Sequence, residues 1–306
     1  MTTNSPNLPN FKHIEVSTKT IIVMTNLIID IKNLFDAIPL TSYPNFEKKS
    51  NHNHLAPGSI IGCNIENKSR GVLTKKKKPS KKNSNWFLNS CTVIIYAPSK
   101  LLNVKICRNG MLQMTGIKDW KQADACVRYI WEMLRKLSAC FTFSRKACLE
   151  GLAPMYDGVL EALFIPAMRN IDFSLGFIVD REKLANYIYS QTEFNAFLEP
   201  SLGYTGVNVK MPLTKNISEL VLKKKIYLPS GEILYSTVPY QEYLKLLSVK
   251  EQEKKTNKQR FNTFLIFNSG KIILSGVSSK FMKDSYNDFY RMIQTCKHEI
   301  EERLDV

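Results

Sequence analysis

The chain has little of what most enzymes and secreted proteins require. Its seven cysteines form no C-x-x-C pair, so they indicate scattered reduced thiols and not a zinc site or a disulfide framework. It has only four histidines, and no catalytic triad order or paired carboxylates stand out. We therefore expect no catalytic residue, no metal ligand and no cofactor, in a protein that is not an enzyme.

Long hydrophobic segments are also missing. No apolar run approaches the roughly 18 residues that a membrane span needs, so we expect no membrane partner. The N-terminal segment MTTNSPNLPNFKH lacks the apolar stretch of a signal peptide. These features predict an intracellular protein with a disordered tail over residues 1–17.

Acidic residues are scarce relative to basic ones. The sequence has 27 Asp and Glu against 43 Lys and Arg, which gives a formal net charge of +16. Such an excess favours an acidic partner, with nucleic acid first and an anionic membrane surface second. A basic surface that is simply solvated is the alternative.

What the sequence does contain is an internal repeat. NVKICRNGMLQMTG (103–116) aligns without a gap with TFLIFNSGKIILSG (263–276), and each copy has the pattern of a β-hairpin with a turn at its first glycine. An apolar stripe at helical spacing follows each copy. The stripes are Ala123, Cys126, Val127, Ile130 and Leu134 after the first copy, and Phe289, Met292, Ile293, Cys296 and Ile300 after the second.

The segments upstream of the hairpins also match. Residues 20–38 and 168–188 each read as a strand followed by a short helix, with Asp180 as the N-cap of the second helix. Residues 56–65 and 204–211 each place a glycine-containing turn before a strand. We therefore predict a pseudo-twofold α+β protein whose antiparallel strands form a sheet with the helices on one face.

The second hairpin is apolar on both of its faces, whereas a hairpin with one wet face should alternate. Leu265, Phe267 and Ile273 lie on the face that the predicted helix leaves open. The first hairpin does alternate, with Lys105, Cys107, Gln113 and Thr115 on its open face. The sequence therefore predicts that something other than the helix covers the second hairpin.

These motifs resemble the TATA-box-binding protein family. LIFNSGKIILSG is similar to the signature of the family's second repeat, and TIIVMTNL and MRNIDFSL resemble its two first strands. The long insertions resemble the divergent versions of large DNA viruses. The resemblance implies a saddle fold of two repeats, with a curved antiparallel sheet and helices on its convex face. The expected boundaries are 18–140 for the first repeat, 141–165 for a connector and 166–306 for the second repeat.

The resemblance also implies double-stranded A·T-rich promoter DNA as a partner, bound in the minor groove. Phe267 would insert between base pairs, together with Tyr204. Other residues would face the groove, its base edges or the phosphates: Leu265, Ile273, Ser275, Lys271, Lys210, Asn170 and Thr115.

The first repeat departs from the family pattern. Cys107 stands where an inserting phenylalanine is expected, and Ala56 stands where its partner would be. Lys105 and Gln113 replace apolar groove-facing residues. Thr20 falls at an asparagine position of the first strand, with Ile22 after it on the same face. Our hypothesis is that only the second repeat inserts side chains, so that DNA is kinked mainly at one end.

The resemblance further implies protein partners and a place of action. Glu199 and Leu202 lie where the family contacts transcription factor IIB, and RNA polymerase machinery would follow. The expected function is transcription initiation in a nucleus or in a host cytoplasmic viral factory. The alternative is a saddle-fold scaffold or architectural protein that has lost sequence-specific DNA binding.

Both repeats carry insertions, expected at about 66–90 and 213–260, between the second strand and the signature hairpin. The second includes LPSGE, the pattern of a hairpin turn. The first includes the run KKKKPSKK (75–82). Three interpretations of this run stay open: phosphate contacts, a nuclear-import signal and a solvated loop.

Deleting residues 75–82 tests the first interpretation. Each lysine that neutralises a phosphate releases counterions, so the deletion should flatten the slope of log affinity against log salt concentration. The slope is measured by titrating labelled duplex at several salt concentrations. An unchanged slope would exclude phosphate contacts by this run.

Overall fold

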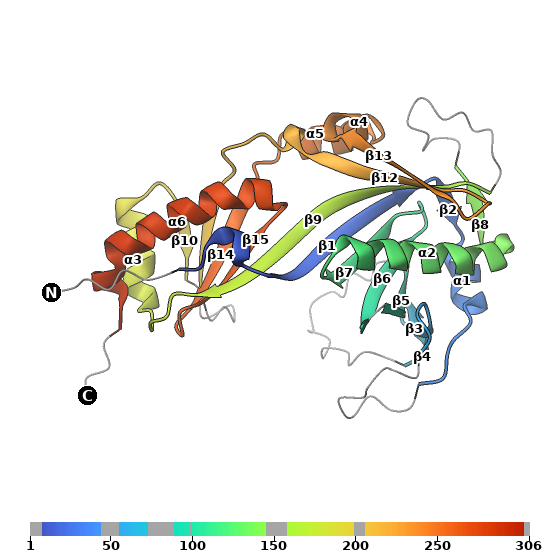
Figure 1. Ribbon diagram of the computed structural model, residues 1–306, viewed down its shortest axis with the longest axis horizontal. Coiled ribbons are helices and arrows are strands. Elements are labelled where there is room, and N and C mark those ends of the chain that lie inside the picture. Colours follow the sequence, from blue (N-terminus) through green and yellow to red (C-terminus); the bar gives the residue numbers. More distant parts are fainter. Residues whose placement is uncertain are drawn as a thin grey trace. The chain divides into compact units, whose positions relative to one another are not determined.

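The computed structural model describes residues 8–43, 55–72, 89–97, 99–144, 158–198 and 206–302. The chain forms two compact units. The second-repeat unit contains residues 1–19, 166–219 and 249–306, and the first-repeat unit contains residues 20–165 and 220–248. Each unit is a sheet with a long helix on one face (Figure 1).

The sheet of the second-repeat unit has the order β10-β11-β14-β15-β9, and adjacent strands are antiparallel. Its strands are β9 (Leu160–Ser174, of which residues 166–174 lie here), β10 (Asn195–Phe197), β11 (Gly206–Pro212), β14 (Phe261–Phe267) and β15 (Lys271–Gly276). Its helices are α3 (Arg181–Gln191), α5 (Val249–Thr256) and α6 (Ser279–Ile300), with short 3-10 turns at Phe11–His13 and Ile217–Glu219. The predicted N-cap is confirmed, since the Asp180 carboxylate accepts hydrogen bonds from the backbone N–H groups of Glu182 and Lys183.

The core of this unit lies between the sheet and α6. Phe264 of β14 stacks on Phe289 of α6, with ring centroids 4.2 Å apart and planes 13° from parallel. The buried Asn262 amide donates to the hydroxyl of Ser285 at 2.8 Å and to the carbonyl of Phe281 at 2.8 Å. The helical stripe predicted from the sequence is confirmed, because all five of its residues are buried.

The sheet of the first-repeat unit has the order β1-β7-β6-β5-β3-β4. Its strands are β1 (Val16–Thr25), β3 (Ile60–Ile65), β4 (Lys68–Gly71), β5 (Ser90–Ala97), β6 (Lys100–Cys107) and β7 (Leu112–Ile117). Its helices are α1 (Ile31–Ala37), α2 (Trp120–Lys136) and α4 (Tyr240–Lys245), with a 3-10 turn at Ser138–Cys140; β2 (Leu27–Ile29) pairs with β8 (Phe141–Phe143). The stripe of α2 is buried against this sheet as predicted.

The two signature hairpins turn at equivalent glycines. Gly110 and Gly270 have φ angles of +75° and +74°, a region that L side chains rarely adopt. A side chain on Gly110 would also clash with the carbonyl oxygen of Leu27, and one on Gly270 with that of Phe177. Both turns therefore need glycine for conformation and for close backbone approach.

The pairing of the second strands differs from the sequence prediction. β11 lies directly beside the first hairpin strand, β14, whereas in the first repeat it is β5 that lies beside β6. β3, which includes most of the segment matched to 204–211, lies one strand further out, beside β5. The counterpart of β11 is therefore β5, and the basic insertion lies before this strand and not after it.

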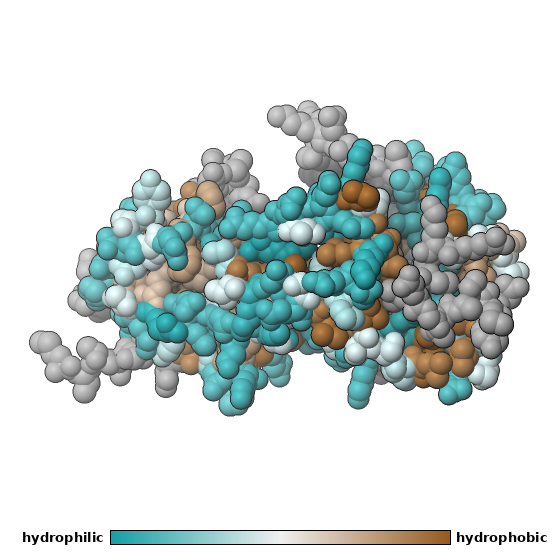
Figure 2. Space-filling view, turned by 90° about the horizontal axis from the view of Figure 1, so that it is seen from above, coloured by the Kyte–Doolittle hydropathy of each residue, from teal (hydrophilic) through white to brown (hydrophobic). Residues whose placement is uncertain are grey.

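The insertion of the second repeat builds onto the first-repeat unit. Its strands β12 (Val221–Tyr227) and β13 (Ile233–Pro239) form the hairpin predicted at LPSGE, and β12 pairs with residues 160–164 of β9. Lys225 forms an ion pair with Asp124 of α2 at 2.6 Å. Figure 2, seen from the side of α4, shows a mainly hydrophilic surface with separate hydrophobic areas.

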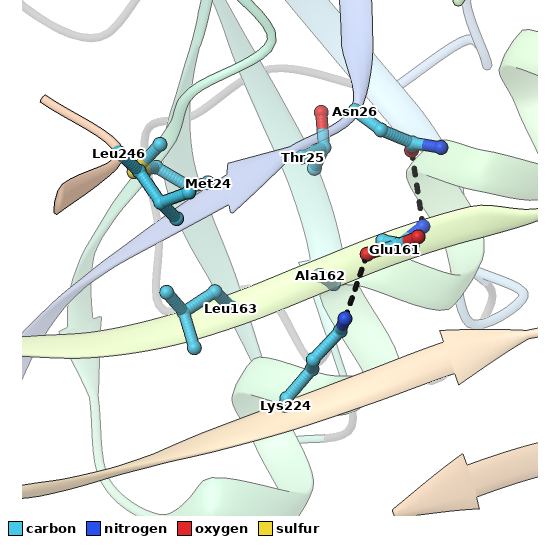
Figure 3. Close-up of a pocket in the computed structure, with 8 residues that line it drawn as sticks. All are labelled: Met24, Thr25, Asn26, Glu161, Ala162, Leu163, Lys224 and Leu246. Atoms are coloured by element: carbon cyan, nitrogen blue, oxygen red, sulfur yellow. Dashed lines mark hydrogen bonds and ion pairs between the residues drawn. The ribbon is translucent and has the colours of Figure 1, made fainter. Parts of the chain in front are cut away.

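A buried ion pair anchors this hairpin. Lys224 lies 2.8 Å from the Glu161 carboxylate, with 6% and 11% of the two side chains exposed. The pair lies in a pocket with Met24, Leu163 and Leu246, and the backbone N–H of Glu161 donates to Asn26 (Figure 3).

The N-terminal segment is more ordered than the sequence predicted. Residues 8–17 were expected in the disordered tail, but Phe11 and Ile14 are buried in the second-repeat core. Tyr286 of α6 donates a hydrogen bond to the carbonyl of Pro9 at 2.6 Å. The aromatic residue of "PNFKH" supplies the apolar contact that orders this segment. The predicted α+β class is confirmed, and each repeat ends in the predicted hairpin and long helix.

The ion pair at Lys224 yields a stability prediction. Lys224→Met leaves Glu161 buried without its counter-charge, which should lower the free energy of unfolding by about 3 kcal/mol. Lys280→Met is the matched control, since Lys280 and Glu219 are also 2.8 Å apart but are 56% and 45% exposed. The control should change stability by less than about 1 kcal/mol. Urea unfolding followed by circular dichroism measures both, and equal losses would contradict the prediction.

Candidate nucleic-acid interface

The second-repeat unit presents one sheet face that α6 does not cover. We call it the second-repeat face. On β14 and β15 the buried residues alternate with half-buried ones, and Leu265 pairs across the strands with Ile273. The predicted apolar residues Leu265 and Ile273 therefore lie opposite each other on the open face.

Two rows of side chains cross this face in register. The apolar row contains Phe197, Asn208, Leu265 and Ile273, and ends at Asp172. The second row contains Lys210, Thr263, Ser275 and Asn170, all of which are polar. The structure thus brings the predicted residues Lys210, Ser275 and Asn170 into one row, and Thr263 completes it.

Phe267 lies at the end of β14 and is half-buried, opposite Gly206 of β11. A side chain on Gly206 would meet the carbonyl oxygen of Ile266 and the side chain of Leu265, so glycine allows the close approach of β11 to β14 here. Lys271 follows on the exposed start of β15, opposite Ser174. The predicted inserting residue and the predicted phosphate contact therefore lie at the same end of the hairpin.

Sequence reasoning missed Phe197. Its side chain is 47% exposed on β10, and the Lys210 ammonium lies 5.3 Å from the centre of its ring. Phe197 stands in the short segment "FNAF", and a three-residue strand is too short to predict from such a segment. Tyr204, Glu199 and Leu202 lie outside the described residues.

The first-repeat face is the equivalent open face of the other sheet. Lys105 pairs with Gln113, Asn103 with Thr115, and Cys107 with Ser90. Thr20 and Ile22 alternate with the buried Ile21 and Val23 on β1 and are half-buried. The structure places all of these residues as predicted, and their roles in binding stay predictions.

Part of the first-repeat face is covered. Tyr43 and Leu55, from the chain between α1 and β3, pack with Ile61 and Ile94 into a small hydrophobic cluster beside Tyr96 and Leu101. Ile94 and Leu101 lie on the open side of β5 and β6, since the residues alternating with them enter the main core. The end of this face near the β5–β6 turn is therefore closed by the protein itself.

Ala56 does not match Tyr204 in this topology. Gly206 pairs with Phe267, and Ser90 pairs with Cys107 at the equivalent point. Two residues before these positions are Tyr204 and Leu88, so Leu88 is the sequence counterpart of Tyr204. Leu88 also lies outside the described residues.

No dense group of metal-ligating side chains appears in the described residues. Across the same residues, no helix combines the length and the hydrophobicity of a bilayer-crossing segment.

Comparison with known proteins supports the resemblance. The chain matches no protein-family model. It is 25% identical over 249 residues to the uncharacterized protein 335L of Invertebrate iridescent virus 6, covering 79% of this chain and 69% of that protein. It is 30% identical over 158 residues to a TATA-box-binding protein-like protein of Acanthamoeba polyphaga mimivirus. The second match supports the resemblance to the divergent TBP-like proteins of large DNA viruses.

The similarity to the mimivirus protein covers 47% of this chain and 41% of that protein. Among solved structures, the TBP of Methanococcus jannaschii aligns with a TM-score of 0.44 and 11% identity, over 92% of this chain and 98% of that one.

Cys107 provides a chemical probe of the first-repeat face. Burial raises the pKa of its thiol, whereas the nearby Lys105 acts in the opposite direction. The other cysteines in the described residues are buried. Since only the thiolate reacts, alkylation of Cys107 should be slower at pH 8 than that of a free thiol.

The rate should keep rising as the pH passes the ordinary thiol pKa. Mass spectrometry of iodoacetamide labelling measures it in a Cys148→Ser background, with Cys107→Ser as the control. A labelling rate that levels off below pH 9 would contradict a raised pKa of the Cys107 thiol.

Proposed function

We propose that this protein binds A·T-rich promoter DNA in the minor groove and acts as a transcription-initiation factor, without enzymatic activity. The observation that carries the proposal is the second-repeat face, where Leu265, Ile273 and Phe267 lie on the side of the sheet that α6 does not cover. Apolar side chains on an open face favour an occupant that is itself partly apolar.

The minor groove has the properties of such an occupant. It offers few polar groups for base-specific contact, and A·T-rich steps unstack more easily than G·C-rich ones. A side chain at the end of a hairpin, such as Phe267, is placed to enter between base pairs. The cations Lys210 and Lys271 lie beside the apolar residues on strands β11 and β15, where phosphates would flank an opened groove.

The protein partners follow from the same proposal. A transcription factor IIB-like protein would contact the segment with Glu199 and Leu202, and RNA polymerase machinery would be recruited through it. The protein would act in a nucleus or in a cytoplasmic viral factory. The TBP-like mimivirus protein supports this family of functions.

A scaffold without sequence-specific DNA binding is the second candidate. The specific observation in its favour is the small hydrophobic cluster of Tyr43, Leu55, Ile61 and Ile94, which covers part of the first-repeat face. Affinities for A·T-rich and G·C-rich duplexes at physiological salt separate the candidates. Tighter binding of A·T-rich duplex supports the initiation factor, equal binding supports an architectural protein, and no binding supports the scaffold.

Substitution of the inserting residue tests the proposed mechanism. Phe267→Ala should lower affinity for A·T-rich duplex by roughly tenfold, equivalent to about 1.4 kcal/mol, and should reduce DNA bending. Cys107→Ala should leave both nearly unchanged, because its side chain is too small to separate base pairs.

Tyr189→Ala is the matched control for loss of an exposed aromatic residue, since Tyr189 is 84% exposed on α3. Fluorescence anisotropy measures affinity and resonance energy transfer between end labels measures the bend. Equal losses from Phe267→Ala and Cys107→Ala would overturn the one-ended mechanism.

A further inference from the structure

The two open faces differ in one row of side chains. In the second repeat this row is Phe197, Asn208, Leu265 and Ile273. The equivalent row of the first repeat, matched strand by strand, is Asn64, Thr92, Lys105 and Gln113. Three of the four positions change from apolar to hydrogen-bonding side chains.

The neighbouring row does not change in this way. Thr263 pairs with Ser275 in the second repeat, and Asn103 pairs with Thr115 at the same positions in the first. Both repeats therefore keep a polar pair there. The difference in chemistry is concentrated in the row that contains Gln113, which we call the polar row.

The polar row lies on the open side of its sheet. Cys63, Cys91, Val104 and Met114, which alternate with its members along the strands, are all in the buried core. Asn64 is exposed, and Thr92 and Gln113 are half-buried. The small hydrophobic cluster contains Ile94, which is the next residue of β5 after Thr92 on this face. The cluster therefore lies beside the polar row and contains none of its residues.

We propose that the polar row accommodates G·C pairs, so that the recognised DNA is asymmetric, with G·C tolerated under the first repeat only. In the minor groove, guanine differs from the other bases by its exocyclic amino donor. Gln113 and Thr92 can each accept a hydrogen bond from this donor, and Gln113 can also donate to a pyrimidine carbonyl. This inference rests on the proposed function, and it adds a specificity that A·T preference alone does not contain.

The apolar row has the opposite consequence. Leu265 and Ile273 offer no acceptor, so a guanine amino group against them would lose its water without gaining a hydrogen bond. An unpaired buried donor of this kind lowers affinity by about tenfold. Where Leu265 and Ile273 face the groove, the second repeat therefore rejects G·C pairs, although Asn208 in the same row keeps an acceptor.

A reciprocal exchange of residues tests the inference. Lys105→Leu with Gln113→Ile gives the first repeat the residues of the second, and Leu265→Lys with Ile273→Gln is the matched reverse exchange. Each protein is titrated against duplexes in which one G·C pair is moved stepwise through an A·T-rich site. Hydroxyl-radical footprints orient the protein on each duplex, and thermal unfolding confirms that the variants fold.

For the wild type, a G·C pair should cost about tenfold in affinity at one end of the site and less than about threefold at the other. The first exchange should extend the tenfold loss to both ends, and the reverse exchange should relieve it under the second repeat.

A symmetric wild-type profile, or a profile that neither exchange alters, would overturn the inference while leaving A·T-rich binding intact. Failure of the wild type to bind any duplex would overturn the proposed function and this inference with it. If an exchanged protein does not fold, the wild-type profile alone still decides the outcome.

Discussion

The packing of one long helix against one face of each sheet is the constraint on which the rest of the structure depends. In the second repeat, the clearest contact of this packing is the stacking of Phe264 on Phe289. In the first repeat, the sheet residues that face α2 form the corresponding core. Because strand side chains alternate between the two faces, this packing determines which residues point away from the helix. The packing of the core thus holds the open-face residues in position, although these residues take no part in that packing.

The same division explains why the repeats match in topology and differ in chemistry. Gly110 and Gly270 each bring the turn against a backbone carbonyl, so neither tolerates a side chain. Core positions are similarly limited, because interiors are close-packed. Lys105 and Gln113 of the first repeat, and Leu265 and Ile273 of the second, lie on the open faces. The packing of the core therefore does not restrict which side chains stand at these positions. Sequence change can therefore concentrate on the open face without loss of the fold.

Local patterns allowed much of the fold to be predicted from the sequence. The hairpins, the helical stripes and the Asp180 cap all depend on residues close together in the chain, and each is observed. The pairing of β3 with β5 and the cover formed by Tyr43 and Leu55 depend on contacts across long insertions. Register across such distances leaves no local pattern, so the match between residues 56–65 and 204–211 was wrong. The binding residues could be placed on a face, because alternation fixes that much, but their roles came only from family resemblance.

The three consecutive lysines of β12 show why composition alone overestimates the charge available to DNA. Lys223 lies 4.8 Å from the centre of the Trp120 ring, Lys224 pairs with Glu161 and Lys225 pairs with Asp124. Each has a different partner, so a shift of one residue would turn every lysine to the opposite face and break all three contacts. Lys224 and Lys225 therefore act in specifying the register of the insertion, and their charges are already balanced by acids within the protein. The net charge of +16 is consistent with a nucleic-acid partner, but it is the position of each lysine that decides whether it contributes to binding.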